Sequence, residues 1–98
     1  MQIIKNMNGT ALNIALEGRL DTTTSPQLEA ELQDSLTDIT ELSLDFSKLE
    51  YISSAGLRVI LFAQKAMNKQ GSMKVCNVNP DIMEIFELTG FCDILTIE

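Results

Sequence analysis

Two short runs near the N-terminus, residues 2–7 and 11–16, are rich in apolar residues and flank Asn8-Gly9-Thr10. Asn-Gly between two such runs is the strongest short-range signal for a β-hairpin, because both residues tolerate the left-handed backbone of a tight turn. The chain is therefore predicted to open with two antiparallel strands.

Apolar residues then change to helical spacing. Ser25 is placed to cap a helix, and Pro26 fits its first turn, where the N–H that proline lacks would have no partner. The apolar positions that repeat along this helix are Leu28, Leu32, Leu36 and Ile39. The acidic residues between them are expected to face solvent; they are Glu29, Glu31, Asp34 and Asp38.

The rest of the chain continues the alternation of strands and helices. We expect a strand around residues 42–46, a helix from near Ser54 to Gln70, a strand at 73–78, a helix from Pro80 to Thr89 and a last strand at 94–97. The predicted order is ββαβαβαβ. Strands joined through helices are parallel neighbours with right-handed crossovers. This gives a single α/β domain, residues 1–98, with an open mixed sheet, the hairpin at one edge and helices packed on the sheet.

The net charge of the chain indicates which kinds of partner it can bind. The chain has 98 residues, 45% of them hydrophobic, and 14 acidic against 7 basic residues, for a net charge of −7. The negative balance argues against nucleic acid and anionic membrane surfaces as partners. No apolar run approaches the ~18 residues of a membrane span, so we expect no direct membrane insertion and a cytoplasmic protein. The sequence does not decide between a monomer and a weak dimer.

Candidate residues for catalysis are few. The chain has no histidine, which excludes catalytic triads and histidine-containing zinc sites. Its two cysteines, Cys76 and Cys92, lack the spacing of a metal-ligand pair and are expected to be small buried apolar side chains. The acidic residues are scattered, and there is no glycine-rich nucleotide loop. We therefore expect no metal, no cofactor and no enzymatic activity.

Residues 51–58, Tyr-Ile-Ser-Ser-Ala-Gly-Leu-Arg, place two hydroxyls and a glycine where a loop enters the second helix. Free N–H groups and the helix dipole make such a position suited to a phosphoryl group. Arg58 follows Ser54 by four residues, so its long side chain would reach back toward a phosphoryl group on that serine. The simpler interpretation, which spacing alone favours, is that Ser53 or Ser54 caps the helix and that Gly56 allows another backbone to approach closely.

A projection of the second helix separates two faces. The apolar face carries Val59, Ile60, Ala63, Ala66 and Met67, and the cations of the other face are Arg58, Lys65 and Lys69. Phe62 projects beside these cations, and Leu61 lies at the other edge of the polar sector. These two side chains either form part of a partner-binding patch that begins at Ser54 or pack under neighbouring loops. Both interpretations stay open.

Five motifs follow one another along the chain. They are Gly18-Arg19-Leu20-Asp21, Leu44-Asp45-Phe46, the turn from Tyr51 to Leu57, Gly71 before Met73-Lys74-Val75-Cys76, and the segment from Phe86 to Phe91. In their order and spacing they resemble the STAS domain, in particular the stand-alone anti-sigma factor antagonists of bacteria. The resemblance covers nearly the whole chain and implies a STAS-like fold.

The resemblance also implies a switch controlled by phosphorylation. In that family a serine kinase that is also an anti-sigma factor phosphorylates a serine at the start of the second helix, and a phosphatase removes the group. The unmodified antagonist binds the kinase and releases the sigma factor. Ser54 matches the acceptor. Family members commonly have an aspartate just before it, where this chain has Ser53, so Ser53 is the second candidate.

The expected partner-binding surface joins the end of the second strand, where Asp21 matches an acidic position of the family, to the start of the second helix. Its residues are Asp21, Thr22, Thr23, Ser53, Ala55, Gly56, Leu57, Arg58, Leu61 and Phe62. A phosphoryl group adds about −1.5 to −2 charges, which a helix start tolerates, so we expect binding to be lost with little change in the fold. The alternative function is a STAS accessory subunit of an ABC-type transporter complex that is never phosphorylated. The sequence identifies neither the sigma factor, the kinase nor the signal.

Overall fold

Strands and helices alternate along the chain in the computed structural model, which describes residues 1–98 in full. The elements are β1 (Gln2–Asn8), β2 (Ala11–Leu20), α1 (Ser25–Ser35), β3 (Glu41–Ile52), α2 (Ser54–Asn68), β4 (Ser72–Cys76), α3 (Pro80–Thr89) and the short 3₁₀ helix η1 (Phe91–Asp93). Their order agrees with the predicted α/β class.

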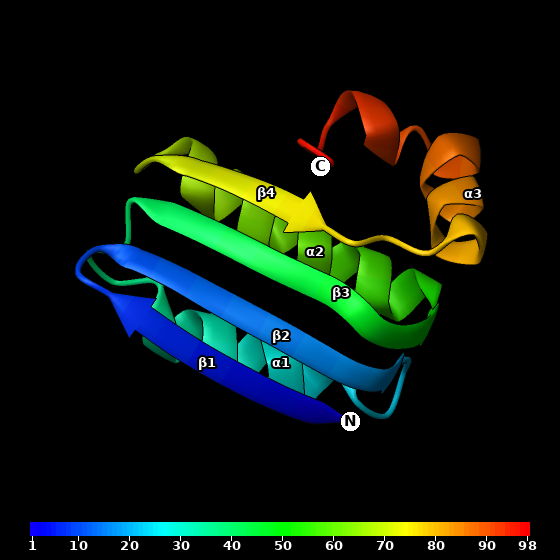
Figure 1. The fold of residues 1–98 in the computed structure, drawn as a ribbon, viewed down its shortest axis with the longest axis horizontal. Coiled ribbons are helices and arrows are strands. Elements are labelled where there is room, and N and C mark those ends of the chain that lie inside the picture. The colour runs from blue at the N-terminus through cyan, green and yellow to red at the C-terminus, as the bar shows by residue number, and fades with distance from the viewer.

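The four strands form one mixed sheet in the order β1-β2-β3-β4 (Figure 1). β1 and β2 are antiparallel and are joined around Gly9, whose φ of 64° suits the tight turn. β2 and β3 are parallel, as are β3 and β4. The predicted open mixed sheet with a hairpin at one edge is confirmed.

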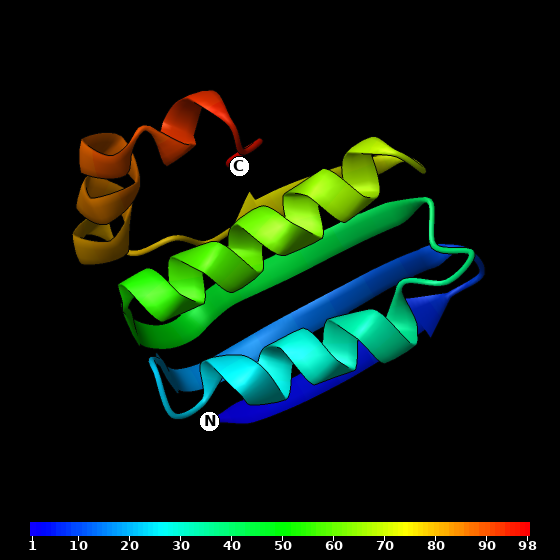
Figure 2. The ribbon, with the colours of Figure 1, turned by 180° about the vertical axis from the view of Figure 1, so that it is seen from behind.

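The core lies between the sheet and two helices. α1 and α2 cover the same face of the sheet (Figure 2), and alternate residues of β2 and β3, such as Ile14 and Phe46, are fully buried beneath them. The apolar positions predicted for the first helix are all buried as well. Burying one such side chain stabilises the fold by about 1.5–3 kcal/mol, so this layer holds α1 and α2 against the sheet.

The start of α1 differs from the prediction that Ser25 caps the helix. Thr24 is the N-cap residue and makes no capping hydrogen bond with its side chain. The Asp21 carboxylate instead accepts hydrogen bonds from the amides of Thr23 and Thr24, at 3.0 and 3.1 Å. Because this Asx-type turn satisfies the first free amides, Ser25 lies one position inside the helix, where its hydroxyl is buried without a hydrogen-bond partner.

The last predicted strand, residues 94–97, is corrected by the structure. Gly90 ends α3 with a left-handed φ of 80°, as its position predicts, but the chain then turns into η1 and reaches the sheet only at Ile97. Ile97 forms a single parallel bridge with Val75 of β4. The 3₁₀ turn uses up the residues that would have extended the pairing, so the sheet has four strands and an isolated bridge instead of a fifth strand.

Candidate functional site

The ends of β2 and β3 lie side by side, and α2 begins there. Ser53 is the N-cap residue of α2, with extended backbone angles (φ −100°, ψ 177°), and its hydroxyl accepts a hydrogen bond from the Gly56 amide at 3.4 Å. The Ser53 amide donates to the Leu20 carbonyl of β2 at 2.9 Å. Ser53 therefore acts as a cap and ties the start of α2 to the end of β2.

Ser54 is the first residue of α2 and lies exposed. Its hydroxyl makes no hydrogen bond within the chain, whereas that of Ser53 holds the Gly56 amide. The first amides of a helix have no intrahelical acceptor, and the dipole adds about half a positive charge there. No acidic residue in the first turn of α2 neutralises this charge. An anionic group on the Ser54 oxygen would therefore be stabilised by the helix.

Gly56 fixes the height of the first turn of α2 above the sheet. A Cβ atom at this position would lie 2.8 Å from side-chain atoms of Leu20 and Ile52 and 2.9 Å from the Leu20 carbonyl oxygen. Such contacts are closer than van der Waals packing allows, so only glycine fits without a shift. The close approach predicted for Gly56 is confirmed, and it holds Ser54 in a fixed place.

Asp21 organises the turn between β2 and α1. Besides the two amides that it holds, it is joined to Thr24 by two further hydrogen bonds, one from the Thr24 hydroxyl to the carboxylate (3.2 Å) and one from the Asp21 amide to that hydroxyl (2.9 Å). The hydrogen bond from the Thr24 amide is the main cause that lowers the pKa of Asp21, with contributions from Thr23 and the charge of Arg19. Asp21 thus carries a negative charge next to the start of α2.

An interaction that the sequence did not reveal joins the ends of β2 and β3. The Arg19 guanidinium lies over the ring of Tyr51, 4.3 Å from its centre, and is 3.8 Å from the Asp21 carboxylate. Arg19 and Tyr51 are paired in the parallel register, but a register shift between Gly18 and Arg19 precedes them. A register shift between two strands cannot be predicted from the spacing of residues along the sequence. Arg19 and Tyr51 nevertheless belong to two of the motifs that resemble the STAS domain.

A groove of about 220 Å³ runs between the starts of α1 and α2. It is lined by Thr22, Ser25, Pro26, Glu29, Ala55, Arg58 and Val59. Arg58 lies exposed on this groove, one helical turn after Ser54, and forms no ion pair with any carboxylate in the chain. A cation at this place is available to a negatively charged group on the same helix face.

Comparison with known proteins identifies the family to which this chain is related. The family model described as the STAS domain matches residues 2–98. The chain belongs to the STAS domain family. Its relatives include BtrV of Bordetella bronchiseptica, provisionally named an anti-sigma factor antagonist, which is 38% identical over 84 residues (84% of this chain, 72% of that protein). The anti-sigma F factor antagonist of Paenibacillus polymyxa is 30% identical over 99% of this chain and 86% of its own length.

Solved STAS structures share the fold. An anti-sigma factor antagonist from Mycobacterium paratuberculosis has a TM-score of 0.89 at 21% identity, covering 98% of this chain and 83% of that one. SpoIIAA in its unphosphorylated form has a TM-score of 0.79 at 18% identity, with 99% and 87% covered. The phosphorylated form of SpoIIAA from Bacillus gives 0.78 at 19% identity, with 99% and 91% covered. The STAS-like fold implied by the motifs is confirmed.

In this STAS domain the predicted partner-binding residues fall into three groups by exposure. The exposed ones are Thr22, Thr23 and Arg58, and the half-buried ones are Asp21, Ser53, Ala55, Leu61 and Phe62. The third group, Gly56 and Leu57, is buried, and Leu57 belongs to the hydrophobic core. These two residues support the surface from beneath and do not form it. Phe62 is half-buried and packs partly against the core, and both interpretations of its role stay open.

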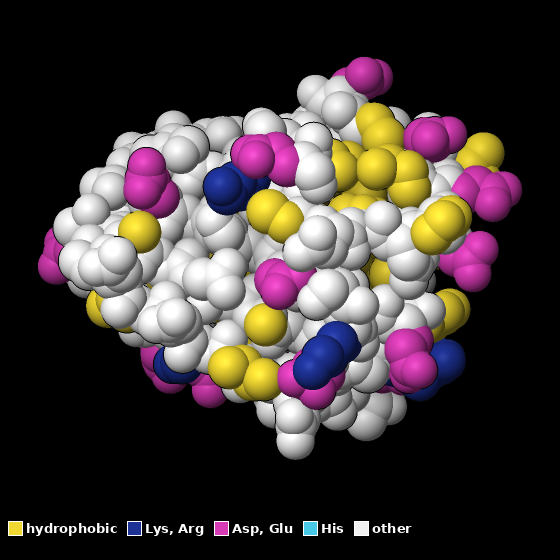
Figure 3. Space-filling view, in the orientation of Figure 1, with side chains coloured by type: hydrophobic (Ala, Val, Ile, Leu, Met, Phe, Trp, Pro, Cys, Tyr) yellow, Lys and Arg dark blue, Asp and Glu magenta, His cyan; other side chains and the backbone are white.

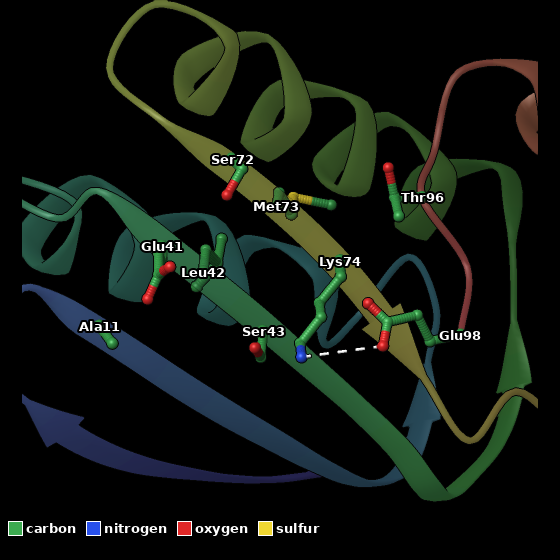
Figure 4. A pocket seen from close by; sticks show the side chains of 9 residues that line it. All are labelled: Ala11, Glu41, Leu42, Ser43, Ser72, Met73, Lys74, Thr96 and Glu98. Atoms are coloured by element: carbon green, nitrogen blue, oxygen red, sulfur yellow. Dashed lines mark ion pairs between the residues drawn. The ribbon is translucent and has the colours of Figure 1, made fainter.

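The largest cavity of the STAS domain, about 250 Å³, lies away from Ser54, where β2, β3 and β4 begin. It is lined mainly by polar side chains on the sheet face that carries no helix, among them Ser43 and Ser72 (Figure 4). Lys74 points across this face toward Glu98, at 3.9 Å. None of the residues predicted for partner binding lines it.

The exposure of Cys92 differs from the expectation that both cysteines are buried. Cys76 is half-buried, but Cys92 is exposed on η1, where its sulfur lies 4.0 Å from that of Met83. Cys92 is the middle residue of η1, none of whose residues is buried. No three metal-ligating side chains come together anywhere in the chain. None of the helices combines the length and the apolar character needed to cross a bilayer.

Proposed function

We propose that this STAS domain is an anti-sigma factor antagonist that binds an anti-sigma factor serine kinase and is released when Ser54 is phosphorylated. The observation that carries the proposal is the exposed, unbonded hydroxyl of Ser54 at the first position of α2, beside a Ser53 hydroxyl that is already used as the cap. The names of the relatives support the same conclusion, because the antagonists of Paenibacillus polymyxa and Bacillus subtilis are each 30% identical over 99% of this chain.

The switch follows from the charges around Ser54. A phosphoryl group would add about −1.5 to −2 charges at pH 7. Within the domain this charge meets the positive end of α2 and the unpaired Arg58, so the fold tolerates it. At the surface it joins the ionised Asp21, whose turn is tied to Ser53 through Leu20. A partner that fits the neutral hydroxyl would then face a desolvation cost and a stronger negative field, which lowers its affinity.

The test uses the purified chain, its cognate kinase and ATP. We expect one phosphoryl group by intact mass, located on Ser54 by peptide mapping, and complete loss of the modification in Ser54→Ala. Ser53→Ala removes the cap and is expected to lower the helix stability but to leave the acceptor in place. Ser72→Ala, at an exposed serine on β4, is the matched control and should be phosphorylated normally.

Binding supplies the second half of the test. Ser54→Asp is expected to weaken binding to the kinase, whereas Ser72→Asp should bind as the unmodified chain does. Phosphate on Ser53 alone, or full binding by Ser54→Asp, contradicts the proposed switch. Absence of phosphate on either serine together with stable co-purification with a transporter would instead support the accessory-subunit function.

A further inference from the structure

The groove of about 220 Å³ between the starts of α1 and α2 is lined by polar groups from both helices. It is called the α1–α2 groove, and its polar side chains are those of Thr22, Ser25, Glu29 and Arg58. A molecule of liquid water occupies about 30 Å³, so this volume corresponds to about seven waters. The groove is therefore large enough for one small ion that keeps part of its hydration shell.

Ser25 contributes a hydrogen-bond donor that the fold leaves without an acceptor. The residue is 3% exposed, and its hydroxyl makes no hydrogen bond within the chain. Its amide already donates to the Asp21 carbonyl at 2.8 Å, so the hydroxyl is the group left over. Buried polar groups without a partner are uncommon because they destabilise the fold. Since Ser25 lines the α1–α2 groove, an acceptor bound there would supply the missing partner.

Arg58 contributes a positive charge that no carboxylate of the chain neutralises. Four other cations each lie within 4.0 Å of a carboxylate; they are Lys5, Arg19, Lys48 and Lys74. Figure 3 shows Lys and Arg side chains next to acidic ones on the face of the sheet that carries no helix. The cations without an ion pair are Arg58, Lys65 and Lys69, and of these only Arg58 lines the α1–α2 groove.

The start of α2 adds a further attraction for an anion. The first amides of a helix have no acceptor within it, and the helix dipole adds about half a positive charge there. Ala55, in the first turn of α2, lines the α1–α2 groove. The start of α1 adds little, because the Asp21 carboxylate already accepts hydrogen bonds from its first amides. Glu29 also lines the groove and opposes the charge of Arg58, so we expect an anion to bind weakly.

We propose that the α1–α2 groove binds one oxyanion of the phosphate class. The anion would accept hydrogen bonds from the Ser25 hydroxyl and the Arg58 guanidinium and would lie against the first turn of α2. Two sources carry this chemistry: free phosphate, and a phosphoryl group on Ser54 itself. Binding of free phosphate does not require that Ser54 is ever phosphorylated, so the inference goes beyond the proposed function and does not depend on it.

The probe for the test is inorganic phosphate, titrated into the ¹⁵N-labelled full chain with the ionic strength held constant by sodium chloride. We expect chemical-shift changes concentrated in residues 22–29 and 54–58, with a dissociation constant of about 1–10 mM. Arg58→Gln should weaken binding about fivefold or more, and Ser25→Ala about threefold or more. Ser25→Ala should also leave the Tm unchanged or raise it, because the hydroxyl that it removes has no partner in the fold.

Two control variants separate binding in the groove from general attraction between phosphate and a cation. Lys65→Gln removes an exposed cation about two turns further along α2, and Ser72→Ala removes an exposed hydroxyl on β4. Both should bind phosphate within about twofold of the unmodified chain. Absence of shift changes in residues 22–29 and 54–58, unaltered binding by Arg58→Gln or Ser25→Ala, or an equal loss in Lys65→Gln would each overturn the proposal.

The same titration of the chain phosphorylated on Ser54 identifies the source of the anion. Loss of free phosphate binding would show that the phosphoryl group of Ser54 fills the α1–α2 groove, whereas unchanged binding would show that the groove takes free phosphate alone. Either result supports an oxyanion site. A chain that binds free phosphate in the groove but is never phosphorylated by its kinase would contradict the proposed function and leave this inference intact.

Discussion

Substitution of Gly56 by alanine tests whether the close contact beneath the first turn of α2 matters. In an ordinary exposed helix, alanine is more favourable than glycine by about 1 kcal/mol, so the change should stabilise the protein. Here the added Cβ would lie 2.8 Å from Leu20 and Ile52, which are 0% and 2% exposed and cannot move aside easily. Overpacking of this kind costs about 1–3 kcal/mol. Because two buried side chains and a carbonyl oxygen are involved, we take the upper half of that range and expect a net destabilisation of about 1–2 kcal/mol.

The assay is urea unfolding followed by circular dichroism, in which a lower midpoint with an unchanged slope reports a loss of stability. Ala30→Gly, at an exposed position within α1, measures the difference between alanine and glycine in this same protein. The cost of the close contact is the loss in Gly56→Ala plus the difference given by Ala30→Gly. If Gly56→Ala leaves the free energy of unfolding unchanged or raises it, the account of how Ser54 is held in place is wrong.

Three further predictions rest on other parts of the chain. The pKa of Asp45 is lowered, first by a hydrogen bond from the Asn77 side chain and then by the Ser47 amide. The ionised carboxylate therefore stabilises the fold fully at pH values above its ordinary pKa of 3.8. This stabilisation is lost as the pH falls through the lower pKa that Asp45 has in the fold. The difference in unfolding free energy between the unmodified chain and Asp45→Asn should accordingly shrink below that pH. Phosphorylation of Ser54 should stabilise the unmodified chain more than it stabilises Arg58→Gln, by about 0.5 kcal/mol in the free energy of unfolding measured by thermal unfolding. Leu32→Ala, at a fully buried position of α1, should cost about 2–5 kcal/mol in thermal unfolding.

The alternation of strands and helices could be predicted because it depends on local periodicity and on turn residues with a clear physical role. Asn8-Gly9 marked the hairpin, Pro80 marked the start of α3, and Gly90 marked its end. The last strand was wrong because residues 94–97 have the composition of a strand but lack the length to extend along β4 once η1 has formed. Whether residues 94–97 form a strand depends on the geometry of the preceding η1 turn, which cannot be predicted from their composition.

The candidate site could be predicted only in part, for a similar reason. Ser54 and Gly56 are neighbours in the sequence, so their roles at a helix start follow from local rules. The pairing of Arg19 with Tyr51 depends on a register shift between two strands, which acts over a long separation in sequence. The capping role of Asp21 was missed because Ser25 was the more familiar capping residue next to Pro26.

The single bridge between Ile97 and Val75 has a consequence for how the protein behaves at high concentration. Val75 offers its amide and carbonyl outward from the sheet, and both are bonded, to Thr96 at 2.8 Å and to Glu98 at 2.9 Å. An unpaired outer strand readily recruits strands from other molecules and begins fibre growth. Residues 96–98 therefore cover the backbone of Val75 at the outer edge of β4, and removing them is expected to increase aggregation through that edge.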